Sequence, residues 1–79
     1  METKKQKQEK LKEACRKMKL EIIFGKNTVH FYSAINQIEI ATAYYAGNTI
    51  IKLDSNYRAS WQREKYNQIF NIIRQINEN

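Results

Sequence analysis

Apolar residues recur at helical spacing near both ends of the chain and at a spacing of two in its middle. Residues 4–19 contain good helix formers and neither glycine nor proline, so they predict a helix. Its narrow apolar stripe consists of Leu11, Ala14, Cys15 and Met18. Because no apolar residue lies between Met1 and Leu11, we expect residues 1–10 to form a flexible basic arm.

A period of two begins at Leu20 and predicts a β-hairpin. Residues 20–24 alternate in character, residues 25–27 read Gly-Lys-Asn and are typical of a turn, and residues 28–33 form a second strand. In this hairpin Val29 and Phe31 face the core.

Residues 34–46 fit two different elements. As a strand, they place Ile38, Ile40, Thr42 and Tyr44 on one face, and Gly47-Asn48 is a turn into a strand over 49–54 with Ile51 and Leu53 facing inward. As a helix, they begin at Ser33 and end at Gly47. The β-branched and aromatic residues favour the strand, whereas the four alanines favour the helix.

The C-terminal segment predicts an amphipathic helix that follows the capping residues 54–56 and runs to about Asn77. Its apolar stripe consists of Tyr66, Ile69, Phe70, Ile73 and Ile76, flanked by Trp61 and Ile72. Together these elements predict a small α+β single domain over 1–79, with an antiparallel sheet of three to four strands between two helices. The order is α-ββββ-α, or α-ββ-α-β-α if residues 34–46 are helical.

Positive charge is concentrated at the ends of the chain. The net charge is +6, and residues 1–19 hold eight basic residues against three acidic ones. A basic segment of this kind attracts polyanions such as nucleic acid or an acidic protein surface. The alternative is a solvated helix that only keeps the protein soluble. The candidate binding residues in this segment are Lys4, Lys5, Lys7, Lys10, Arg16 and Lys17.

Two further surfaces carry candidate binding residues. The sheet face opposite the C-terminal helix is expected to hold Ile23, His30, Tyr32, Ala41, Ala43, Tyr45 and Ile50, with the charged residues Glu21, Glu39 and Lys52 among them. Of these, Tyr32, Tyr45 and Lys52 suit the stacking of unpaired bases. This face is too apolar to be left in water, so the first helix, a second copy of the chain in a homodimer, or a partner is expected to cover it. On the last helix, Arg63, Asn67 and Arg74 lie close together on the polar side.

The composition argues against catalysis and cofactor binding. Two isolated glycines provide no phosphate-binding loop, and one cysteine with one histidine provides too few ligands for structural zinc. Cys15 lies on an apolar stripe, where packing explains it better than nucleophilic chemistry. We therefore expect a protein that is not an enzyme, with no catalytic residues, cofactor or metal.

The compartment and the partners follow from the same reasoning. No apolar run is long enough for a membrane span, no secretory signal is recognisable, and a single cysteine fits a reducing compartment, so we expect a cytoplasmic protein. The leading hypothesis is a small binding protein that engages nucleic acid or a nucleoprotein complex. The alternative is a phage-type inhibitor or adaptor that docks on a host protein or on a nucleic-acid-handling complex.

Overall fold

The order of elements in the computed structural model is helix, four strands, helix. The structure describes residues 3–47, 49–56 and 60–78. The elements are α1 (Lys4–Lys17), β1 (Leu20–Phe24), β2 (Thr28–Ser33), β3 (Glu39–Ala46), β4 (Thr49–Ser55) and α2 (Ser60–Glu78). The strands form one antiparallel sheet in the order β1-β2-β3-β4. The predicted α+β class and the four-strand interpretation are therefore confirmed, and residues 39–46 are a strand.

α1 begins with a capping box at its first turn. The Thr3 hydroxyl accepts a hydrogen bond from the Gln6 amide at 3.2 Å, and the Gln6 side chain accepts one from the Thr3 amide at 2.9 Å. Residues 4–10, expected to belong to a flexible arm, form the first turns of the helix. The spacing of Thr3 and Gln6 is a capping signal that is visible in the sequence. Residues 1 and 2 of the expected arm lie outside the described residues, as do Asn48 and residues 57–59.

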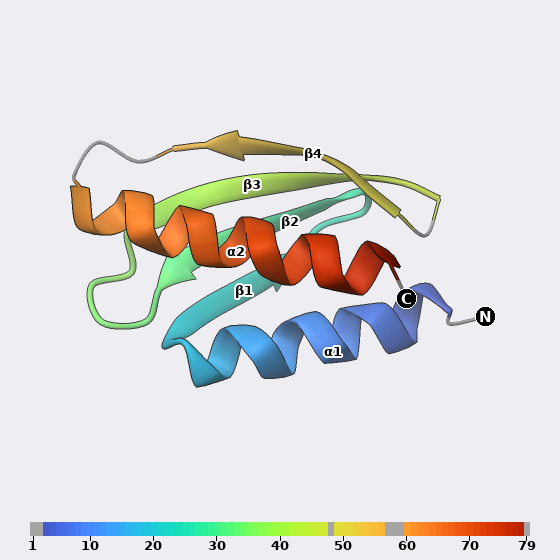
Figure 1. Cartoon of the computed structure of the whole chain (residues 1–79), viewed down its shortest axis with the longest axis horizontal. Helices are drawn as coiled ribbons and strands as arrows, with labels where there is room; N and C mark the ends of the chain where they lie inside the picture. Colours follow the sequence, from blue (N-terminus) through green and yellow to red (C-terminus); the bar gives the residue numbers. More distant parts are fainter. Residues whose placement is uncertain (1–2, 48, 57–59, 79) are drawn as a thin grey trace.

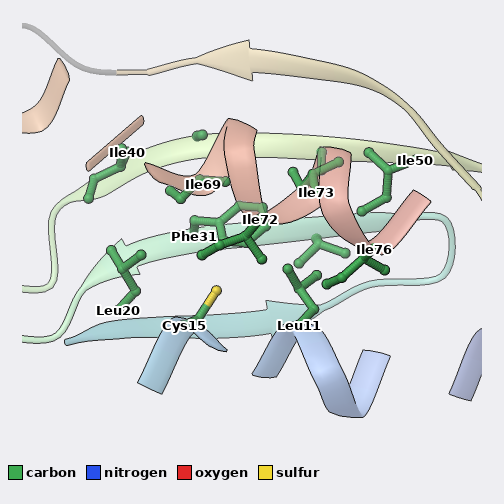
Figure 2. Packing of buried hydrophobic residues seen from close by; sticks show 13 residues of the cluster. Leu11, Cys15, Leu20, Phe31, Ile40, Ile50, Ile69, Ile72, Ile73 and Ile76 are labelled. Atoms are coloured by element: carbon green, nitrogen blue, oxygen red, sulfur yellow. The ribbon is translucent and has the colours of Figure 1, made fainter. Parts of the chain in front are cut away.

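Both helices pack on the same face of the sheet and run in opposite directions (Figure 1). This inner face contributes Val29 and Phe31, both fully buried, as predicted from the alternation in β2. Figure 2 shows the isoleucines of α2 in one cluster with Phe31, which Leu11 and Cys15 of α1 complete. The main core side chains are Leu11, Cys15, Leu20, Val29, Phe31, Ile40, Ile50, Ile69, Ile72, Ile73 and Ile76.

A β-bulge in β3 reverses the predicted faces of that strand. Phe31 pairs with Ala41 but Tyr32 pairs with Glu39, so Ile40 is an extra residue. Ile40 and Ala41 are consequently both fully buried. Beyond the bulge the predicted inner residues Thr42 and Tyr44 lie on the outer face, while Ala43 and Tyr45, predicted outside, lie on the inner face.

A second bulge has the same effect in β4. Tyr44 pairs with Lys52 but Tyr45 pairs with Ile50, which leaves Ile51 as the extra residue. Ile50 is buried against the helices, whereas Ile51, predicted to face inward, is 66% exposed. Leu53 packs against the core as predicted.

α2 is fixed to β4 and to α1 by polar side chains on two of its flanks. The Tyr66 hydroxyl donates to the Leu53 carbonyl at 3.1 Å, and the side-chain amide of Asn77 donates to the Ile50 carbonyl at 2.8 Å. The Lys65 ammonium donates to the Met18 carbonyl at 2.7 Å, at the C-terminus of α1 where a cation is favourable.

The side of α2 that faces the sheet is not the predicted apolar stripe. Ile72, expected at the flank, is buried, whereas Phe70, expected in the core, is 50% exposed. Ile69, Ile73 and Ile76 occupy the core as predicted, and Trp61 lies at the margin with 41% exposure.

Truncation of Ile69 and of Phe70 should therefore affect stability very differently. Ile69 is fully buried, so Ile69→Ala should lower the free energy of unfolding by about 2–5 kcal/mol. Phe70→Ala removes a half-exposed ring and should lower it by only about 1 kcal/mol. Urea denaturation of the two variants measures both values, and equal losses would contradict this orientation of α2.

The turn after α1 contains a residue with an unusual backbone conformation. Lys19 has a φ of 59°, in the left-handed region that favours glycine. Its amide donates to the Arg16 carbonyl at 3.1 Å, and its carbonyl accepts from the Ala34 amide at 3.0 Å. These bonds hold the residue in that conformation between α1 and β1.

Replacement of this lysine by glycine should relieve the backbone strain. We expect Lys19→Gly to leave stability unchanged or to raise it by up to about 1 kcal/mol, since glycine avoids the steric cost but is more flexible when unfolded. The matched control is Lys12→Gly in the exposed middle of α1, which should cost about 1 kcal/mol. Thermal denaturation compares the two, and a similar loss in both variants would argue against the left-handed turn.

Candidate functional site

Basic side chains dominate the exposed surface of α1 and of the turn after it. Six basic side chains are exposed here, against two exposed carboxylates, Glu9 and Glu13. The exposed basic residues are Lys5, Lys10, Lys12, Arg16, Lys17 and Lys19. Four of these are candidate binding residues predicted from the sequence, whereas Lys12 and Lys19 were not predicted.

These charges form two rows along the helix. Lys5, Lys12 and Arg16 fall within about 40° of one another at 3.6 residues per turn, whereas Lys10 and Lys17 lie on the opposite flank. The first row borders β1, because Lys12 and Arg16 line a shallow recess there with residues 20–23. The acidic Glu9 and Glu13 lie between the rows, and Glu13 forms an ion pair of 2.6 Å with Arg16.

Lys4 and Tyr45, two of the predicted binding residues, contact each other within the fold. The Lys4 ammonium lies 4.7 Å from the centre of the Tyr45 ring and donates to the Lys26 carbonyl at 3.4 Å. Tyr45 is half-buried, and burial raises the pKa of its hydroxyl. The prediction that Tyr45 lies on the open sheet face is wrong because of the bulge, and these two residues join α1 to β3. Lys7, also predicted to bind, is only partly exposed.

The polar side of α2 forms a separate surface. Arg63, Asn67 and Arg74 are exposed, and Arg74 lines a recess with Phe70 and Ile51 on the flank of α2 next to β4. Lys65, by contrast, reaches α1 from the other flank. The structure therefore does not bring the α2 residues together with the rows on α1. Arg74 also forms an ion pair of 3.4 Å with Glu78.

The outer face of the sheet is covered by neither helix, so the first of the three expected covers, the N-terminal helix, is ruled out (Figure 1). The alternation of side chains places on it Glu21, Ile23, Thr28, His30, Tyr32, Glu39, Thr42, Tyr44, Lys52 and Asp54. Four other residues expected on this face lie inside, namely Ala41, Ala43, Tyr45 and Ile50. Carboxylates outnumber lysines on this face, so it is electrostatically unfavourable for a polyanion.

Glu39 is the centre of a polar cluster on that face. One carboxylate oxygen accepts from the Thr42 hydroxyl at 3.1 Å and from the side-chain amide of Asn56. The other lies 3.6 Å from His30 Nδ1. A hydrogen bond with Glu39 raises the pKa of the Tyr32 hydroxyl. Tyr32, predicted to stack on bases, is thus one of several groups tied to this carboxylate. Thr42 and Asn56 were not predicted from the sequence, because their proximity depends on the bulge in β3.

Lys52, the last predicted residue of this face, is also bound locally. Its ammonium lies 5.6 Å from the centre of the Tyr44 ring and 3.6 Å from the Asp54 carboxylate. These contacts partly neutralise the charge that was expected to attract a ligand.

The described ranges contain neither a metal-binding cluster nor a membrane-spanning helix. Residues 3–47, 49–56 and 60–78 hold no group of three or more His, Cys, Asp or Glu side chains suited to a metal ion. Within the same ranges, no helix has both the length and the apolar character needed to cross a membrane.

Comparisons of the chain with protein-family models, with curated proteins and with solved structures give no significant match. The function therefore has to be inferred from the charges and shapes of the surfaces described above.

Cys15 provides a test of the packing between α1 and the sheet. It is fully buried, and burial raises the pKa of its thiol from 9.0 to about 12. Since the unfolded chain ionises first, this group should destabilise the fold as the pH rises from about 9 towards 12, and by about 2 kcal/mol at about pH 10.5. Urea denaturation at about pH 7 and pH 10.5 should show a smaller pH-dependent loss in Cys15→Ala. An equal loss in both proteins would mean that the thiol is not buried.

Proposed function

We propose that the protein is a non-enzymatic binding protein that engages a nucleic-acid duplex through the exposed surface of α1. The observation that carries the proposal is the excess of exposed basic side chains over carboxylates on this one helix and its following turn. Lysine and arginine neutralise phosphates and release counterions, which supplies most of the free energy of nonspecific binding. Binding of this kind requires no catalytic group.

The two rows of charge favour a duplex over a single strand. They lie on opposite flanks of α1, with Glu9 and Glu13 between them. A helix with its side chains is about 10–12 Å wide, close to the roughly 12 Å of the major groove of B-form DNA. Basic flanks contact the phosphates of both groove walls in this arrangement. Stacking of unpaired bases on the sheet is disfavoured by the carboxylates of the outer face.

A second candidate function is docking on a protein, as an inhibitor or adaptor would. The observation that favours it is the exposure of two large apolar side chains that line one recess, Ile51 at 66% and Phe70 at 50%. The two functions are separated by a pull-down from cells with and without nuclease. Retention of the same protein after nuclease treatment supports docking, and its loss supports binding through nucleic acid.

The salt dependence of DNA binding tests the role of α1. Lys5→Gln/Lys17→Gln removes one charge from each flank and should reduce the slope of log affinity against log salt by about 2, because each phosphate that is no longer neutralised lowers it by about 0.9. Arg63→Gln/Arg74→Gln makes the same change in charge on α2 and should leave the slope nearly unchanged. Fluorescence anisotropy with a labelled duplex over a range of salt concentrations measures both slopes.

Two results would contradict the proposal. Equal changes of slope in the two variants would indicate diffuse attraction by the net charge, without a surface on α1. Absence of binding by the unmodified protein at about 50 mM salt would exclude a nucleic-acid function, because electrostatic binding is strongest at low salt.

A further inference from the structure

The two outer edges of the sheet differ in how their backbone groups are satisfied. Along β4, side chains of α2 bind groups that point away from β3. Asn77 binds both the carbonyl and the amide of Ile50, at 2.8 and 3.4 Å, and Tyr66 binds the carbonyl of Leu53 at 3.1 Å. α2 thus occupies positions that another strand would need, a known protection of sheet edges.

The opposite edge, β1, has outward backbone groups of its own. The Gly25 amide donates to the Thr28 carbonyl at 2.8 Å, and the Ala34 amide donates to the Lys19 carbonyl at 3.0 Å. Hydrogen-bonded pairs alternate along an antiparallel ladder, so residues 21 and 23 also bond to β2. The amides and carbonyls of Leu20, Ile22 and Phe24 therefore point outward. Among the described residues, no hydrogen bond to these groups is present.

A recess runs along this same edge. It has a volume of about 290 Å³ and lies between α1 and β1, lined by Lys12 and Arg16 on one side and by residues 20–23 on the other. Its lining includes four consecutive residues of β1, so it follows the strand. Ile23, on the outer face, is 57% exposed.

From this geometry we propose that the outer edge of β1 binds an extended peptide with alternating acidic and apolar residues as a fifth strand. Successive side chains of an added strand point to opposite faces of the sheet. Those on the inner side meet Lys12 and Arg16, which complement carboxylates. Those on the outer side include a neighbour of Ile23, which complements an apolar side chain.

The charges also select among occupants of this edge. A second copy of the chain would bring two rows of Lys5, Lys12 and Arg16 together, and their repulsion opposes pairing of β1 with β1. Nucleic acid lacks the regular donors and acceptors of a peptide backbone that match the outward groups of the strand. The proposal is independent of DNA binding, although the two ligands share Lys12 and Arg16 and therefore compete.

The probe for this site is a synthetic peptide of about eight residues in which glutamate and valine alternate. Two forms of this peptide carry N-methyl groups on alternate backbone amides, one form at the odd positions and the other at the even positions. In one form the methyl groups point towards β1, and in the other they point away from it. We expect one form to bind about tenfold or more weakly than the other, since only one set of peptide amides bonds to the strand. Titration of the isotope-labelled protein followed by NMR should shift the amides of Leu20, Ile22 and Phe24.

Matched controls separate the strand pairing from simple charge attraction. A peptide of the same composition with all glutamates before all valines should bind at least about tenfold more weakly. Lys12→Gln/Arg16→Gln should weaken binding of the alternating peptide about three- to tenfold, whereas Arg63→Gln/Arg74→Gln should not.

Three results would overturn the proposal. The first is equal binding of the two N-methylated forms. The second is that the peptide changes NMR signals of the protein only on the outer face or on α2. The third is a dimer of the protein alone with β1 at its interface. Failure of DNA binding alone would leave this result untouched, because the peptide titration is carried out without nucleic acid.

Discussion

The packing of α2 across the inner face of the sheet is the contact on which the other features of the fold depend. Its buried isoleucines pack around Phe31, a fully buried side chain of β2 (Figure 2). The same orientation directs Tyr66 and Asn77 at β4 and Lys65 at the end of α1. One helix thus supplies much of the core, closes one edge of the sheet and holds the C-terminus of the basic helix. A chain of 79 residues has little other surface to bury.

The two bulges determine which side chains each surface presents. With a regular ladder, Tyr45 and Ile50 would lie on the outer face and Thr42 in the core. The extra residues Ile40 and Ile51 reverse this, so the outer face receives Thr42 and Tyr44 in place of Tyr45 and Ile50. The hydrogen bond of Thr42 with Glu39 on the outer face, and the packing of Tyr45 and Ile50 against the core, are therefore consequences of two single-residue insertions in the ladder.

The sequence predicts the elements much better than it predicts their faces. Helical spacing locates both helices, and alternation locates the β1–β2 hairpin with Val29 and Phe31 inside. The faces of residues 41–45 in β3 and of residues 50–51 in β4 are predicted wrongly, because a bulge has no characteristic residue here and follows from tertiary packing. The prediction that Phe70 lies in the core is wrong for a related reason, since the rotation of α2 depends on the hydrogen bonds of this helix to β4. The basic segment is visible in the sequence, whereas its division into two rows and the recess beside β1 require the three-dimensional arrangement.

The small number of anchors beneath α1 has a consequence for ligand affinity. Only Leu11 and Cys15 of this helix are buried, whereas α2 buries Gln62 and four isoleucines. Local opening in proteins starts where few side chains are buried, so α1 is expected to detach more readily than α2. Any ligand held by α1 binds only the docked form, and its apparent affinity scales with the population of that form. Substitutions beneath the helix, far from the charges, therefore tune binding through thermodynamic linkage.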